Sequence, residues 1–167
     1  MTGMRRSAVC VQSFMENGGL MTQTAVVSLP FADLRDRLKA RTEELDHADD
    51  IDLTEALRYL TALPDAEHTP DSVEALVQLA RNFFFAAQPM EALQAASLAS
   101  RMAASLGQDL LVCDARGVEG LALSDLGRFT EATVAHAESW RLARTLGDFE
   151  REGWAIKRVG DLWQAMA

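Results

Sequence analysis

Two stretches of this chain repeat the same residues forty positions apart, and this repeat constrains the fold more than any other feature. Leu106-Gly107 returns as Leu146-Gly147, and Gly120 returns as Gly160. Each unit contains two apolar stripes at helical spacing, separated by a glycine or another small residue. A period of 20 to 50 residues that holds a helix pair is typical of a solenoid. We therefore expect an all-α fold, an α-solenoid of antiparallel helix pairs.

The helix stops divide the chain into units. We expect repeats over residues 71–107 and 108–147 and an incomplete repeat over 148–167, preceded by a capping helix pair over 31–70 and a disordered leader over 1–30. Asp71 or Ser72 is expected to cap the helix that follows the loop. An alternative for the leader is that translation starts at Met15 or Met21. The predicted helices run from about Phe31 to Asp46, Leu53 to Leu63, Ser72 to Ala87, Pro89 to Leu106, Asp109 to Leu126, Thr130 to Leu146 and Phe149 to Ala165.

The formal net charge is −9, and it is concentrated in one part of the chain. Between Glu43 and Asp71 ten carboxylates face a single cation, Arg58. Such a surface repels phosphate backbones, so we expect no nucleic-acid partner. No apolar run approaches the roughly 18 residues of a membrane helix, so no membrane partner is expected either. Two widely separated cysteines, Cys10 and Cys113, favour a reducing, cytoplasmic location.

The sequence offers no constellation for catalysis. His47, His68 and His136 have no ligand spacing to one another or to the cysteines, so we expect no metal site and no cofactor. Cys113 lies on an apolar helical face and is expected to be an inert core thiol. No phosphate loop or nucleophile motif is present. The prediction is therefore that the chain is not an enzyme and has no catalytic residues; an activity abolished by changing Cys113 or His136 would reverse it.

The repeats resemble those of tetratricopeptide repeat (TPR) proteins. Three charged or polar residues, Arg116, Glu119 and His136, stand where that family usually has apolar ones. The resemblance implies a right-handed superhelix in the bacterial cytoplasm. The family's commonest period is 34 residues, and the longer form here is similar to repeats of bacterial signalling proteins. The residues that carry the resemblance are Leu76, Leu79-Ala80, Phe83, Ala92 and Ala99 in the first repeat, Gly120, Leu123 and Ala132 in the second, and Ile156, Val159-Gly160 and Trp163 in the third.

In that family the first helix of each pair lines a concave surface that binds proteins or peptides. The resemblance therefore implies a partner-binding face that mixes aromatic and charged side chains. Carried onto this sequence, the predicted face consists of Arg81, Phe84, Phe85, Asp114, Leu121, Asp125, Trp154, Lys157, Asp161 and Gln164.

The last helix has no following helix to cover its apolar residues. A wet apolar face of that size is rare on a monomer, so we expect a homodimer through Leu162, Trp163 and Met166. The predicted function is a non-catalytic protein-protein or peptide-binding module, as the regulatory or sensory segment of a bacterial signalling protein such as a diguanylate cyclase. The alternative is a stand-alone adaptor or secretion chaperone.

Overall fold

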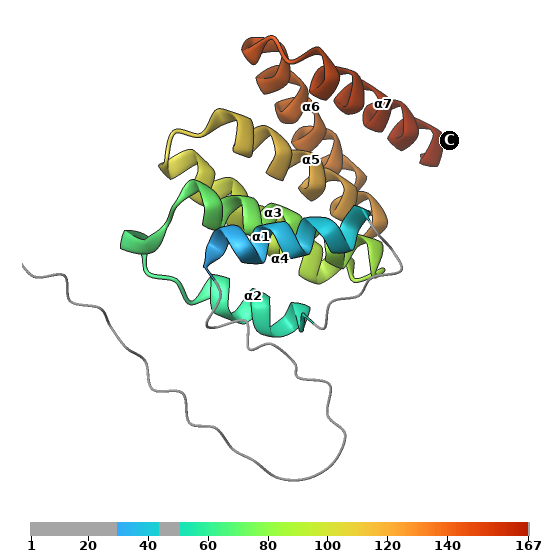
Figure 1. Ribbon diagram of the computed structural model, residues 1–167. Coiled ribbons are helices and arrows are strands. Elements are labelled where there is room, and N and C mark those ends of the chain that lie inside the picture. Colours follow the sequence, from blue (N-terminus) through green and yellow to red (C-terminus); the bar gives the residue numbers. More distant parts are fainter. Residues whose placement is uncertain (1–29, 44–50, 167) are drawn as a thin grey trace, which may run out of the picture.

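The computed structural model describes residues 30–43 and 51–166, which form seven α-helices and one 3₁₀ turn without a β-strand (Figure 1). The expected leader lies almost wholly outside the described residues, as do His47 and the predicted end of the first helix at Asp46. The all-α fold class is confirmed. The helices are α1 (Phe31–Glu43), α2 (Leu53–Thr61), α3 (Pro70–Phe85), α4 (Pro89–Ser105), α5 (Asp109–Asp125), α6 (Phe129–Leu146) and α7 (Phe149–Ala165), with the 3₁₀ turn at Asp65–Glu67.

The turns that end α3 to α6 fall at intervals of twenty residues. Ala87, Gly107, Gly127 and Gly147 all have positive φ, between 56° and 71°. In each turn the N–H of the residue after the positive-φ position donates to the carbonyl five residues earlier, as in Gln108 N to Ala103 O at 2.9 Å, which is a Schellman-type helix end. Three of the four positions are glycine because this residue adopts positive φ without steric cost. These turns recur every twenty residues, which is half of the forty-residue period of the sequence.

From α3 to α7 each helix packs on the next, and α5 also contacts α3 and α7. Alanine is frequent where helices approach closely, and most of these alanines have no exposed surface. Larger side chains such as Phe83, Leu76 and Leu79 fill the spaces between the helices. The burial of these apolar side chains supplies most of the stability of such a helical stack.

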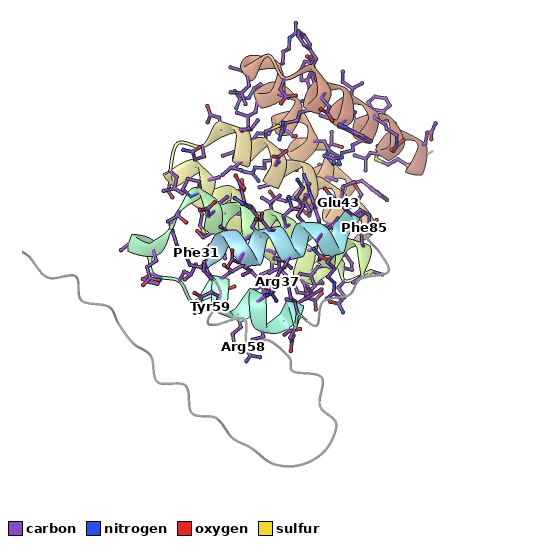
Figure 2. All side chains as sticks on the ribbon, viewed as in Figure 1. Phe31, Arg37, Glu43, Arg58, Tyr59 and Phe85 are labelled. Carbon is purple, nitrogen blue, oxygen red and sulfur yellow. The ribbon has the colours of Figure 1, made fainter. Side chains whose placement is uncertain are left out.

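The first two helices do not form the helix pair expected for the cap. α1 packs mainly on α3, and α2 also makes its main contacts with α3. The two meet where the Phe31 and Tyr59 rings lie 6.0 Å apart (Figure 2). The Asn82 side chain fixes α1 on α3, because its Nδ2 donates to Leu38 O at 2.8 Å and to Thr42 Oγ1 at 2.9 Å. Both helices at this end of the chain are thus attached mainly to α3.

The cap of α3 differs from the prediction. Thr69 is the N-cap residue, and it exchanges hydrogen bonds with Ser72 in a capping box. Pro70 then takes the first helical position, where its missing N–H is not needed. Asp71 and Ser72 therefore lie inside the first turn. None of the described helices is long and apolar enough to cross a membrane.

Candidate functional site

A cavity of about 450 Å³ opens between α3, α5 and α7. Its walls come mainly from α3, α5 and α7, with single residues of α1 and α6. A second cavity of about 430 Å³ adjoins it toward α1 and shares Arg81, Asp114 and Arg151 with it. The two form one continuous depression, which we call the groove. The lining of the larger cavity is Thr42, Arg81, Phe84, Phe85, Cys113, Asp114, Val118, Leu121, Ser139, Glu150, Arg151, Trp154 and Arg158.

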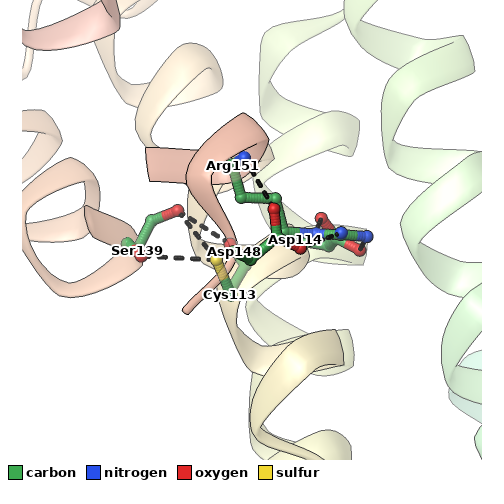
Figure 3. Close-up of polar contacts among 5 residues, drawn as sticks. All are labelled: Cys113, Asp114, Ser139, Asp148 and Arg151. Atoms are coloured by element: carbon green, nitrogen blue, oxygen red, sulfur yellow. Dashed lines mark hydrogen bonds and ion pairs between the residues drawn. The ribbon is translucent and has the colours of Figure 1, made fainter. Parts of the chain in front are cut away.

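One ion pair crosses the floor of the groove and ties α7 to α5 (Figure 3). Arg151 binds Asp114 with both ends of its guanidinium, Nε to Oδ1 at 2.8 Å and Nη2 to Oδ2 at 2.9 Å. Its Nη1 also donates to the N-cap residue Asp148 at 2.6 Å. These bonds raise the pKa of Arg151, so the pair stays charged. Asp114 is thereby neutralised and does not present a free negative charge to the groove.

Cys113 and Ser139 join α5 to α6 beside this ion pair (Figure 3). The Cys113 thiol donates to Ser139 O at 3.3 Å, and Ser139 Oγ donates to Cys113 O at 3.0 Å. Burial raises the pKa of the Cys113 thiol. A thiol with a raised pKa is a poor nucleophile because little thiolate forms. This environment favours a structural role for Cys113.

Two of the residues that depart from the family pattern form a polar network on α5. Arg116 contacts Glu119 at 2.7 Å and Glu138 of α6 at 2.9 Å. Glu119 also accepts from Ser97 of α4 at 2.9 Å. The network thus links three successive helices at a position where apolar packing was expected. It lies apart from the groove lining and has a structural role.

The third departure, His136, is packed against Gly120. His136 is 1% exposed, and a Cβ added at Gly120 would lie 2.7 Å from Nε2 and closer still to Nδ1 and Cε1. Burial, together with the nearby charge of Arg158, lowers the pKa of His136 to about 4. Its Nδ1 has no hydrogen-bond partner among the described residues. His136 therefore fills the space that the missing Gly120 side chain leaves.

The structure brings six of the ten predicted partner-binding residues to the larger cavity. Asp125 lies exposed at the end of α5, and Lys157, Asp161 and Gln164 are exposed on α7, outside the lining of both cavities. Lys157 pairs with Asp161 at 2.6 Å along the helix. The six residues in the lining are Arg81, Phe84, Phe85, Asp114, Leu121 and Trp154.

The sequence reasoning missed the arginines of α7. Arg151, Trp154 and Arg158 recur at spacings of three and four, so they share one helical face, and this face lines the groove. Lys157 lies about 100° around the helix from Arg158. Arg151 lies three residues before Trp154 and Arg158 lies four residues after it, so the helical spacing from Trp154 could have identified both arginines.

The predicted self-association residues separate in the structure. Leu162 is 3% exposed and packs with Leu123, Ala132 and Ala135, so it belongs to the core and not to an outer face. This corrects the prediction, and the reason is that α7 turns this residue toward α6. Trp163 remains exposed, as does Met166.

Among residues 30–43 and 51–166, no three His, Cys, Asp or Glu side chains are grouped so that they could hold a metal ion. The groove therefore offers aromatic, aliphatic and charged contacts rather than a metal centre. No protein-family model, no curated protein and no solved structure matches this chain.

Proposed function

We propose that this chain is a non-catalytic TPR-like module that binds a peptide segment of a partner protein in the groove. The observation that carries this proposal is that the first helix of each predicted repeat contributes to a single cavity. The sequential packing of α3 to α7 and the equal spacing of their turns support a right-handed solenoid as the underlying arrangement.

The aromatic residues of the groove are the proposed anchors for the ligand. Phe84 and Phe85 pack edge to face, with ring centroids 5.6 Å apart, on the α3 side. Trp154 lines the same cavity from α7 and is half exposed. Aromatic side chains of this kind supply much of the free energy of peptide binding. We propose that the chain is the regulatory segment of a bacterial signalling protein such as a diguanylate cyclase. The alternative is that it is a stand-alone adaptor or secretion chaperone.

Selection of a displayed random peptide library on the full chain tests the proposal. We expect peptides to be recovered, and the double substitution Phe85→Ser with Trp154→Ser to weaken their binding at least tenfold, because two exposed anchors are lost. The matched control is Met90→Ser with Val134→Ser, which removes two exposed apolar side chains outside the groove and outside the exposed face of α7. Affinities are measured by fluorescence polarisation. Equal losses in both variants, or no recovered peptide, would contradict the proposal.

We also propose that the outer face of α7 binds a second copy of the chain. Phe149, Ile156 and Trp163 are exposed and lie seven residues apart, and no atom lies within 4 Å of a Cβ built at Gly153 or Gly160 between them. Large residues alternating with glycines form a stripe that is complementary to itself. One repeat earlier the equivalent face is covered, since His136 of α6 covers Gly120 as described above.

The dimer is tested by light scattering over a concentration series. We expect the unaltered chain to be a dimer and Trp163→Glu with Met166→Glu to be monomeric, because charged groups would be buried at the interface. Val134→Glu, an exposed apolar position on α6, is the control and should leave the dimer intact. A monomeric unaltered chain, or a dimer that survives the double substitution, would exclude this interface.

A further inference from the structure

Two further arginines line the larger cavity beside the Asp114–Arg151 ion pair. Arg81 of α3 and Arg158 of α7 both line the larger cavity, and both are partly buried. Within the described part of the chain neither makes an ion pair or a side-chain hydrogen bond. Arg151, which lines the same cavity, uses its guanidinium fully on Asp114 and Asp148. Within the described residues the larger cavity therefore contains one paired arginine, Arg151, and two arginines without an ion-pair partner, Arg81 and Arg158.

The fold places Arg158 where its charge is costly. Its guanidinium lies against α5 at Gly117, and a Cβ added to that glycine would collide with Nη1. Burial lowers the pKa of Arg158, and the nearby charge of Arg81 lowers it further. The two guanidinium groups thus repel each other in a partly dry site. An anion between them would relieve both the desolvation and the repulsion.

The charges around this cavity favour an anionic ligand although the whole chain carries −9. The larger cavity is lined by three arginines, Arg81, Arg151 and Arg158, and by two carboxylates, Asp114 and Glu150. Asp114 is bound by Arg151 and, although it is near enough to act on Arg158, makes no ion pair with it. Glu150 is exposed in the first turn of α7, where water weakens its influence. The remaining walls are apolar or aromatic, with Phe84, Phe85 and Trp154 among them. A ligand that complements both the two arginines and the apolar walls has a carboxylate next to an apolar or aromatic group.

We propose that the groove recognises an acidic residue beside an aromatic one, with Arg81 and Arg158 binding the carboxylate and Trp154 and the phenylalanines contacting the aromatic group. The arginine guanidinium presents paired donors that suit a carboxylate. The cavity volume, about 450 Å³, is in the range of sites that enclose a small ligand or a few side chains. This inference rests on the proposed function, since both place the ligand in the same groove.

The test uses two matched pairs of probes on the full, isotope-labelled chain: acetyl-Phe-Asp-Phe-amide against acetyl-Phe-Asn-Phe-amide, and 3-phenylpropionate against 3-phenylpropanamide. Binding is followed by NMR through the arginine Nε–H signals and by the dissociation constant. We expect the Asp peptide to bind at least tenfold more tightly than the Asn peptide and to shift the Arg81 and Arg158 signals. Shifts with 3-phenylpropionate equal to those with the peptide would identify a small organic acid as the ligand, and the carboxylate recognition would still hold.

The double substitution Arg81→Gln with Arg158→Gln is expected to abolish the preference for the acid over the amide. The control is Arg141→Gln, which removes an exposed arginine of α6 and should leave the preference intact. Among the described residues neither Arg81 nor Arg158 has an ion pair or side-chain hydrogen bond that the replacement would remove. The melting temperature of the variant, measured beside its binding, distinguishes a loss of binding from unfolding.

The two proposals fail in different ways. If the acid and the amide bind equally well, or if the double arginine variant keeps the preference, the acidic ligand is excluded while peptide binding in the groove stands. If neither peptide binds and no groove signal shifts, while the library selection also recovers nothing, both proposals fall. If peptides are recovered that lack acidic residues, only the present inference is overturned.

Discussion

Replacing Gly120 by alanine is expected to lower the free energy of unfolding by about 2 kcal/mol. The new methyl group would overlap three atoms of the buried His136 ring, and overpacking of this kind costs about 1–3 kcal/mol. The ring has little freedom to move away because it is 1% exposed. The gain in helix propensity from glycine to alanine, about 1 kcal/mol at most, offsets only part of that cost. Urea unfolding followed by circular dichroism measures the difference.

The chain contains a matched control for this substitution. Gly160 occupies the equivalent position one repeat later, and a Cβ there would meet no atom within 4 Å. Gly160→Ala is therefore expected to leave stability unchanged or to raise it slightly. The combination of Gly120→Ala with His136→Ala should recover part of the loss, giving a coupling energy of about 1 kcal/mol or more. Equal stability of the Gly120→Ala and Gly160→Ala variants would show that the contact with His136 is unimportant.

Acidification is expected to destabilise the fold through the same histidine. In the unfolded chain His136 has a pKa of about 6.5, whereas in the folded chain burial lowers the pKa to about 4. Between these values the unfolded state binds a proton that the folded state does not, so stability falls as the pH drops from about 6.5 toward 4. The full difference is about 3 kcal/mol. Below pH 4 both states are protonated, and the loss from this residue ends.

The measurement compares urea unfolding at pH 7.5 and 5.5, above the pI of about 4.8 where association would interfere. Over that interval the unaltered chain should lose about 1.3 kcal/mol through His136. His136→Leu should show no such loss, and its stability at pH 7.5 should be close to normal because Nδ1 has no bond to lose. The carboxylates whose pKa is lowered, such as Asp148, titrate at lower pH. The same slope in both proteins would contradict the assignment.

The helices were predictable because glycine and proline mark their ends so clearly. The start of α4 at Pro89 and the bounds of α7 agree with the prediction. The prediction of the N-cap of α3 was wrong because three residues that can cap a helix, Thr69, Asp71 and Ser72, lie close together. Only the geometry of the chain shows that Thr69 is the cap. The arrangement of α1 and α2 was not accessible either. Their apolar faces predict that each packs on another helix but do not name that helix, and for α1 the hydrogen bonds of Asn82 fix α3 as the neighbour.

For the site, the repeat identified the helices that line the groove but not the face of α7. A one-residue error in register moves a side chain by about 100°, which separates the exposed Lys157 from the groove-lining Arg158. Leu162 is buried for the same reason, because the rotation of α7 about its axis turns this side chain toward α6. The role of Gly117 was also hidden, because the side chain that fills the space above it comes from a helix forty residues away. Spacing within a helix is readable, whereas the rotation of that helix depends on its neighbours.

The twenty-residue interval between the left-handed turns has a consequence for how such a molecule changes in length. Every helix from α4 to α7 has 17 or 18 residues, so successive interfaces have nearly the same extent. Inserting or deleting forty residues between equivalent turns would preserve the type of every remaining contact, whereas inserting a single residue inside a helix would rotate the following side chains by about 100° relative to the neighbouring helix. The chain in this architecture would therefore lengthen or shorten by whole forty-residue units. Each unit gained or lost would add or remove one helix from the wall of the groove.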